Sequence, residues 1–347
     1  MKKLSSLVNF DLPFVVYKLP HSSRVQLLQQ NTTELFTDKD LKQEGFYFAP
    51  YDFDKHPVLI LPVQSSSQSD YLLRDFQTTS SSFSLSVLTD ENEANQHQQK
   101  VAKAVRLIKQ NKLEKLIISR RIKVSVNNFN SLDALLSLMR NRDESFVYLW
   151  HHPQVGTWLG ATPELMANYQ DETFQTVALA GTLPVDQNTP VNWSIKEINE
   201  QKIVSDYIEK QLKNFTDQVI VEKPKTVYQG SIAHIKNELS AKILHKDLSN
   251  LIKKLHPTPA VCGMPTDIAK KYISEIEDYD RKYYTGFLGI KSPQKLQFYV
   301  NLRCLEVYDK QLCLYVGGGI VADSIPEKEW QETIYKSDVL LQNFDIK

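Results

Sequence analysis

A run of strand-like segments between Phe146 and Leu179 constrains the fold more than any other feature of this sequence. The apolar stretches in it are short, and they are separated by Gly156, Gly160 and Pro163, residue types that end strands and begin turns. Short strands joined by tight turns pair antiparallel with their neighbours in the sequence. We therefore expect an antiparallel sheet that closes at the turn Ala180-Gly181-Thr182.

A second antiparallel unit is expected near the C-terminus. Lys295–Tyr308 and Gln311–Val316 read as a hairpin that ends at the triple glycine Gly317–Gly319. Leu255–Pro265 contains three prolines and is expected to be irregular, because proline interrupts both helices and ladders. Antiparallel strands with helices between and outside them define an α+β class. Apolar residues at helical spacing or in alternation predict helices at Glu91–Asn111, Ser131–Met139, Ser194–Lys213, Thr266–Glu277 and Ser324–Asn343, and a strand within Leu113–Val126.

The first 90 residues carry weaker structural signals. Serine-rich tracts at Ser65–Ser67 and Thr78–Ser82 lie next to short strands such as Val58–Val63, and we expect mobile loops there. No linker-like stretch divides the chain after residue 90. We therefore expect one domain over residues 1–347, with 1–90 as a variable N-terminal part and 112–347 as its core.

Charge and cysteine content exclude several functional classes. The 41 Lys+Arg balance 41 Asp+Glu, which argues against a nucleic-acid-binding protein. No segment reaches the roughly 18 apolar residues that span a membrane, and Asn9 and Asp11 interrupt the apolar stretch that a signal peptide needs. Three cysteines without a CxxC pair predict neither a disulfide framework nor a zinc site. We expect a cytoplasmic protein.

Carboxylates at helical spacing occur on two of the predicted helices. Glu329, Glu332 and Lys336 share one face of the last helix, just after the triple glycine, where backbone can approach a ligand closely. Glu197 and Glu200 repeat the spacing on the helix at 194–213. Carboxylates drawn from two helices would suit Mg²⁺, which takes few protein ligands and keeps several waters. The alternative interpretation is two charged helix faces exposed to solvent.

Two single residues could carry acid–base chemistry. Glu164 follows a turn inside the strand-rich region, where partial burial would raise its pKa toward neutrality and suit a general acid. Lys115 precedes the apolar run Leu116–Ile118, where a half-buried amine would favour its uncharged form. An exposed carboxylate and a lysine reaching the surface are the alternatives.

Several stretches together resemble the chorismate-utilising enzymes, and the isochorismate synthase branch in particular. The resemblance covers about two thirds of the chain, from about residue 112 to the C-terminus. The matching stretches, in the family's order, are Lys115–Arg120 (KLIISR), Gly160–Leu165 (GATPEL), Leu179–Thr182 (LAGT), Leu255–Ala260 (LHPTPA) with Gly263 and Pro265, Arg281 with Tyr284 and Gly286, Arg303, Gly317–Ile320 (GGGI), and Glu329–Thr333 (EWQET) with Lys336.

The resemblance implies two large, mainly antiparallel sheets packed together with helices outside, and an active site between the sheets. It implies chorismate as substrate and Mg²⁺ as the essential ion. By the matched positions, Glu200 and Glu332 are the metal ligands, Lys115 is the base that activates water for attack on C2 of the ring, and Glu164 is the acid that assists departure of the C4 hydroxyl. The expected substrate-binding residues are Gly181, Thr182, His234, Tyr284, Arg303, Gly318 and Lys336.

Lys115 also separates branches of this family. Enzymes that add ammonia, such as anthranilate synthase, use no lysine base there, so we expect water as nucleophile and no glutamine amidotransferase subunit. The predicted activity is an isochorismate synthase, monomeric or weakly dimeric, that feeds menaquinone or siderophore biosynthesis. The alternatives are a salicylate synthase, which goes on to eliminate pyruvate, and a non-catalytic chorismate-binding protein.

The chain departs from the family pattern around Glu200. Where the family reads K-D-R-x-E-H, residues 196–201 read K-E-I-N-E-Q, so that Ile198 and Gln201 replace an arginine and a histidine. Leu183 also stands where an arginine often follows the A-G-T turn. These changes leave the ligands in place and bear on the fine geometry of the site. His234 is equally compatible with a packing role.

Overall fold

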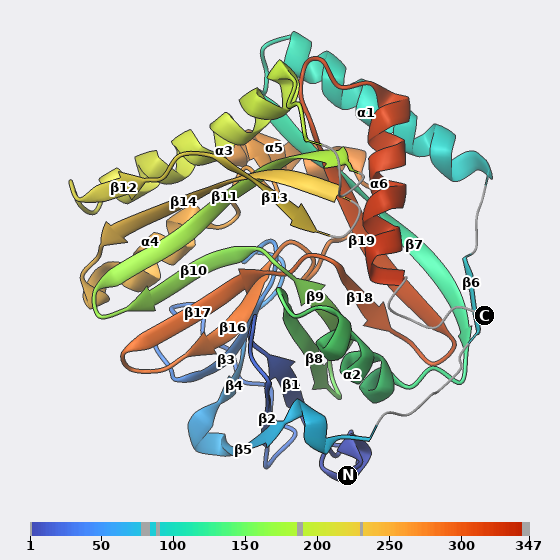
Figure 1. Cartoon of the computed structure of the whole chain (residues 1–347), viewed down its shortest axis with the longest axis vertical. Helices are drawn as coiled ribbons and strands as arrows, with labels where there is room; N and C mark the ends of the chain where they lie inside the picture. The colour runs from blue at the N-terminus through green and yellow to red at the C-terminus, as the bar shows by residue number, and fades with distance from the viewer. Residues whose placement is uncertain (1, 78–83, 88–90, 186–189, 230–231, 342–347) are drawn as a thin grey trace.

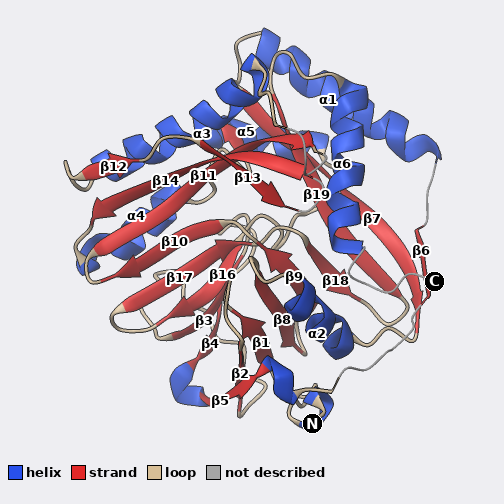
Figure 2. Cartoon of the chain, in the orientation of Figure 1, coloured by secondary structure: helices blue, strands red, loops and turns tan. Residues whose placement is uncertain are grey.

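The structure is a computed structural model that describes residues 2–77, 84–87, 91–185, 190–229 and 232–341. Two large antiparallel sheets pack against each other (Figures 1 and 2). Within the described residues, sheet 1 has the order β15 (Gly263–Met264), β7 (Lys115–Asn127), β19 (Gln311–Ile320), β18 (Cys304–Val307), β9 (Gly156–Thr162), β8 (Phe146–His152), β1 (Phe14–Lys18), β2 (Arg24–Gln30) and β5 (Ser66–Leu72), and β6 (Ser84–Val87) pairs with β7.

Along the chain, groups of consecutive strands that form sheet 2 alternate with groups that form sheet 1. Within the described residues, the order of sheet 2 is β12 (Val219–Val221), β14 (Ile232–Lys242), β11 (Thr173–Pro184), β10 (Leu165–Gln170), β17 (Lys295–Val300), β16 (Phe287–Lys291), β3 (Gly45–Ala49) and β4 (Leu59–Pro62), and β13 (Lys225–Gln229) pairs with β14. The predicted α+β class with two antiparallel sheets is therefore confirmed.

Aromatic side chains fill the space between the sheets. Phe48 of sheet 2 stacks on Trp150 of sheet 1, with ring centroids 4.6 Å apart. Phe146 of sheet 1 stacks in the same way on Tyr299 of sheet 2, also at 4.6 Å. Such pairs add directional stabilisation to a large buried apolar area, and so they fix how the sheets face each other.

Helices cover the faces of the sheets that point away from the aromatic layer. Leucines of α2 pack on sheet 1 with Val147 and Leu149, and α1 and α5 bury their apolar faces against Leu116 and Ile118 of β7. The apolar stripes of α3 and α4 cover sheet 2 around Phe174. The helices are α1 (Glu91–Lys109), α2 (Ser131–Asn141), α3 (Ile195–Lys213), α4 (Leu248–Leu255), α5 (Thr266–Ile276) and α6 (Pro326–Leu341). No helix among the described residues is long and apolar enough to cross a membrane.

Two of the points at which the chain crosses from one sheet to the other lie next to each other. Pro163 and Glu164 connect β9 of sheet 1 to β10 of sheet 2, and residues 301–303 connect β17 of sheet 2 to β18 of sheet 1. The two crossings are tied together, because Val300 N–H donates to the Glu164 carbonyl at 2.9 Å and Ala161 N–H donates to the Arg303 carbonyl at 3.2 Å.

The predicted C-terminal hairpin was partly wrong. Only β18 pairs with β19, whereas residues 295–300 belong to the other sheet. The triple glycine lies at the end of β19 as expected, and it is paired there, Gly318 with Ile118 and Gly319 with Ile117. Local alternation is the same on both sides of a crossing, so the sequence pattern does not reveal a change of sheet.

The N-terminal quarter is more regular than predicted. It supplies β1, β2 and β5 to sheet 1 and β3 and β4 to sheet 2. The serines at 65–67 lie in a short 3₁₀ turn and at the start of β5, rather than in a loop. The tract at 78–82 and the predicted end of the last helix at Asn343 lie outside the described residues.

Candidate active site

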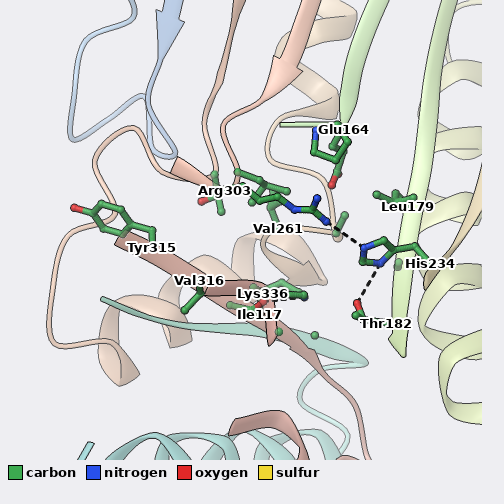
Figure 3. Close-up of a pocket in the computed structure, with 18 of the residues that line it drawn as sticks. Ile117, Glu164, Leu179, Thr182, His234, Val261, Arg303, Tyr315, Val316 and Lys336 are labelled. Carbon is green, nitrogen blue, oxygen red and sulfur yellow. Dashed lines mark hydrogen bonds between the residues drawn. The ribbon is translucent and has the colours of Figure 1, made fainter. Parts of the chain in front are cut away.

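A cavity of about 860 Å³ lies between the sheets, beside the two crossings (Figure 3). Lys115 and Glu332 do not line this cavity, but each pairs with a charged residue that does. Lys115 Nζ is 3.1 Å from Glu200 Oε1, and Glu332 Oε1 is 2.7 Å from Lys336 Nζ. Nine of the eleven site residues predicted from the sequence line the wall itself: Glu164, Gly181, Thr182, Glu200, His234, Tyr284, Arg303, Gly318 and Lys336.

Glu164 is held at the first crossing with its carboxyl group facing the cavity (Figure 3). Its backbone N–H donates to Thr162 Oγ1 at 3.3 Å, and Thr162 donates in turn to the Val300 carbonyl. Burial raises the pKa of Glu164 to about 7, although the positive charges of Lys115, Lys336 and Arg303 act in the opposite direction. Near neutral pH this carboxyl group can therefore hold a proton and donate it, as the sequence analysis expected of an acid.

Lys115 is fully buried, whereas the sequence suggested half-burial. It begins β7, and the Gly263–Met264 strand covers it because Met264 pairs with Lys115. Its Nζ has no hydrogen-bond partner of good geometry; the contact with Glu200 Oε1 is an ion pair. A buried amine without hydrogen bonds is poorly solvated in its charged form, and Glu200 is the group that compensates that charge.

Four carboxylates of α3 and α6 surround the Lys196 ammonium group or act on its charge, and three of them lie against the glycines of β19. We call Glu197, Glu200, Glu329 and Glu332 the carboxylate cluster. A methyl group on Gly318 would lie 3.3 Å from Glu332 Oε1 and 3.5 Å from Glu329 Oε2, and one on Gly319 would collide with Glu200 Oε1. Three of the four carboxylates therefore lie against these two glycines, and at Gly319 a larger residue would collide with one of them.

Three members of the carboxylate cluster, Glu197, Glu200 and Glu329, are buried. Glu329 Oε2 is buried without a hydrogen-bond partner. Burial, together with the neighbouring charge of Glu332, raises the pKa of Glu329 to about 7, against the opposing effect of Lys196. Carboxylates this close together attract a cation where a carboxylate oxygen, here Glu329 Oε2, has no partner.

The donor set fits a hard divalent cation with few protein ligands. No three histidine, cysteine, aspartate or glutamate side chains converge as a complete metal cage in the described part of the chain. A glutamate from each of two helices, a glycine floor and an orphaned carboxylate oxygen are what a cation such as Mg²⁺ needs when water or a ligand completes its shell. Glu200 and Glu332, the metal ligands predicted from the sequence, both belong to this cluster, and their role as ligands stays a prediction.

His234 of β14 lies between Thr182 and Arg303 (Figure 3). Its Nδ1 is 3.1 Å from the Gly181 carbonyl, which can only accept, and its Nε2 is 3.4 Å from Arg303 Nη2, which can only donate. The ring is therefore neutral with its proton on Nδ1. Burial and the charges of Arg303 and Lys336 lower the pKa of His234 to about 3, in agreement with this assignment.

The remaining predicted residues complete the wall. Tyr284 is buried and stacks on Tyr315 with centroids 5.1 Å apart. Lys336 Nζ also donates to the Gly317 carbonyl at 3.0 Å. Sequence reasoning missed Lys196, whose Nζ lies 2.7 Å from Glu329 Oε1 inside the carboxylate cluster. Its position one residue before Glu197, in the first turn of a helix, was the available signal.

Comparison with known proteins identifies the family. Residues 61–345 match the family described as chorismate binding enzyme. The chain belongs to this family. The resemblance found in the sequence is thereby confirmed.

The named relatives are longer than the region over which they align with this chain. The isochorismate synthase DhbC of Bacillus subtilis is 34% identical over 203 residues, which are 55% of this chain and 51% of the relative. The isochorismate synthase MenF of Haemophilus influenzae is 30% identical over 250 residues, 68% of this chain and 57% of the relative. The chain thus spans little more than half the length of these relatives.

Solved structures support the fold. The menaquinone-specific isochorismate synthase MenF of Escherichia coli superposes with a TM-score of 0.82 at 20% identity, covering 99% of this chain and 92% of MenF. Anthranilate synthase component I of Streptococcus pneumoniae superposes with a TM-score of 0.71 at 16% identity, covering 96% and 93%. The fold is therefore common to enzymes with different names, and the function must be argued from the site.

Proposed function

We propose that this protein is an isochorismate synthase that converts chorismate to isochorismate with the help of Mg²⁺. The observation that carries the proposal is a pair of buried groups beside one cavity. Glu164 is a buried carboxyl group with a pKa of about 7, and the positive charge of the buried Lys115 acts on it. The names of the relatives support it. A general acid and a general base at one cavity are what acid–base catalysis of this reaction requires.

The cavity is suited to a dianion such as chorismate. Arg303 and Lys336 both line it, and a substrate carboxylate near either would gain a charge-assisted hydrogen bond. Arg303 is held by the Nε2 lone pair of His234, so its guanidinium is aimed before the substrate arrives. Apolar wall residues such as Leu179, Val261 and Leu302 would contact the ring.

Lys115 and Glu164 would carry the proton transfers. Lys115 takes a proton from water as the water oxygen bonds to C2 of the ring. The ring double bonds shift, the C4–oxygen bond breaks, and Glu164 supplies the proton with which that oxygen leaves as water. One water is consumed and one released, so the reaction is an isomerisation. The base role requires the uncharged form of the Lys115 amine at the moment of attack.

Glu200 and Glu332 would hold the Mg²⁺, which supplies charge neutralisation at a substrate carboxylate. Gly318 and Gly319, which lack side chains, leave the space that the Glu200 and Glu332 carboxylates occupy. We expect Glu200→Ala and Glu332→Ala to lose Mg²⁺ binding, measured by calorimetry without substrate. Variants that titrate with Mg²⁺ like the parent protein would contradict these ligands.

Lys115 favours water over ammonia as the nucleophile, and on this basis we propose that no glutamine amidotransferase subunit is needed. The shared fold with anthranilate synthase component I does not decide this point, because the fold is the same for both. We propose menaquinone or siderophore biosynthesis as the pathway, since relatives named for each resemble the chain.

The decisive experiment is a product assay. The protein is incubated with chorismate, with and without Mg²⁺, and the products are separated by chromatography. We expect isochorismate to accumulate only with Mg²⁺. Salicylate and pyruvate as sole products would make it a salicylate synthase, and chorismate-dependent thermal stabilisation without turnover would make it a binding protein.

Substitution of the base tests the mechanism within the same assay. We expect Lys115→Gln to lower turnover at least about a hundredfold, the usual scale of acid–base catalysis, with a much smaller change in chorismate affinity. Lys112→Gln, an exposed lysine three residues earlier, is the matched control. A Lys115→Gln protein with a near-normal rate would refute the base assignment.

A further inference from the structure

Lys196 places an ammonium group inside the carboxylate cluster. Its Nζ donates to Glu329 Oε1 at 2.7 Å and lies 3.9 Å from Glu197 Oε1, and Glu200 and Glu332 also act on its charge. Ser194 caps α3 and accepts a hydrogen bond from the Lys196 N–H, which fixes where the side chain starts. Lys196 is thus directed to the space that a divalent cation would use.

Lysines already compensate most of the charge of the cluster. Lys115 pairs with Glu200, Lys336 with Glu332, and Lys196 with Glu329. A divalent cation bound here would share these carboxylates with the ammonium groups that already pair with them, so like-charge repulsion would act on the nearest ammonium group.

Lys196 is the lysine with room to move away. Lys115 is fully buried in β7, and Lys336 is held by the Gly317 carbonyl on the wall of the inner cavity. Lys196 instead lines a second, outer cavity of about 1820 Å³, which is open to solvent and also bordered by Trp193 and Tyr335. Rotation of its side chain into that space needs no movement of backbone.

We propose that Lys196 is a built-in counter-cation of the carboxylate cluster, and that a divalent cation binds as the Lys196 ammonium leaves Glu329 and turns into the outer cavity. The proposal rests on the Mg²⁺ site of the proposed function. Lys196 thereby keeps buried carboxylates compensated before the cation arrives, and it sets the affinity for the cation by competing with it.

The first test measures Mg²⁺ binding by calorimetry without chorismate. We expect Lys196→Gln to bind Mg²⁺ at least about tenfold more tightly than the parent protein, because a competing positive charge is gone. Without Mg²⁺ the same variant should melt at a lower temperature, since Glu329 loses its partner, and Mg²⁺ should raise its melting temperature more than that of the parent protein.

Matched variants separate competition from general electrostatics. Lys328→Gln removes the same charge from another wall residue of the outer cavity and should change Mg²⁺ affinity much less. Lys196→Arg keeps both the charge and a partner for Glu329, and should bind Mg²⁺ no more tightly than the parent protein. Unchanged, weaker or absent Mg²⁺ binding by Lys196→Gln would overturn the proposal.

A measurement on the unaltered protein guards against a variant that fails to fold. Acylation of lysines followed by mass spectrometry should label Lys196 severalfold faster with saturating Mg²⁺ than without it, while Lys202, exposed on the same helix, should be unaffected. Equal or slower labelling of Lys196 would refute the movement. The product assay is independent: a protein that shows these effects but forms no isochorismate would overturn the proposed function alone, and the reverse result would overturn this inference alone.

Discussion

At the scale of single residues, Glu164 shows how position along the chain creates an acid. It lies where the backbone leaves one sheet for the other, so its side chain enters the space between them and is almost fully buried. The same burial has a cost in stability, because the folded protein disfavours the ionised carboxylate. Acid function and a local destabilisation thus have one cause.

Glu164→Gln should therefore stabilise the protein in a pH-dependent way. The pKa is raised from 4.5 to about 7, so the stability that goes with the protonated form is fully present below pH 4.5 and is lost as the pH rises through 7. The shift corresponds to about 3 kcal/mol. We expect the variant to gain about that much unfolding free energy over the parent protein between pH 4.5 and pH 8, measured by urea denaturation. Glu114→Gln, at an exposed site, is the control, and a gain that is the same at both pH values would contradict the assignment.

His234 should stay neutral, with its proton on Nδ1, throughout the pH range in which the protein is folded. The Gly181 carbonyl and Arg303 leave no other tautomer, and the pKa is lowered to about 3. Nitrogen-15 NMR of the imidazole should show this tautomer unchanged from pH 5 to pH 8. Titration of the ring near pH 6.5 would show that Arg303 is not held in this way.

At the scale of elements, a buried ion pair joins α5 to the strands beside the cavity. Arg281 donates to both carboxylate oxygens of Glu277, at 2.8 and 2.6 Å, and also to the carbonyls of Ile117 on β7 and Val261 in the preceding loop. Ile117 and Val261 both line the cavity. The pair therefore holds two parts of its wall at a fixed separation.

Arg281→Met should be strongly destabilising, because it leaves the Glu277 carboxylate buried without its partner. We expect a loss of about 3–5 kcal/mol in unfolding free energy, measured by urea denaturation. Lys202→Met, which breaks an exposed pair with Asp206, should cost about 0.5 kcal/mol or less. A loss within 1 kcal/mol of the Lys202 control would show that the buried pair contributes little.

At the scale of the whole molecule, the two sheets are held together by packing rather than by covalent links. The three cysteines are buried and free. Phe48 is in contact with Trp150, Trp158 and Tyr283, which places it at the centre of the aromatic layer. The cavity depends on this layer, since it forms only where the sheets are held at the right distance.

Phe48→Ala should therefore lower the unfolding free energy by about 3–5 kcal/mol, the usual cost of removing a buried phenylalanine. Tyr228→Ala, at a site that is 50% exposed, is a control with a much smaller expected effect. Urea denaturation followed by tryptophan fluorescence reports on both. Equal losses in the two variants would show that the aromatic layer does not hold the sheets together.

The sequence by itself determined the elements and the chemistry of the family. The helix from Ser131, the strand from Lys115 and the carboxylate spacing on α3 and α6 depend on local periodicity and residue type, which are written in adjacent residues. The motifs around Glu164 and Glu332 predicted the family for the same reason, since each is short and contiguous.

Only the tertiary structure decided what those elements do together. Whether residues 295–300 join sheet 1 or sheet 2, how deeply Lys115 is buried, and that Lys196 enters the carboxylate cluster all depend on segments far away in the chain. Strand pairing and burial depend on all the neighbouring segments together, so a local sequence pattern does not predict them. The site exists because two crossings, more than a hundred residues apart, meet in space.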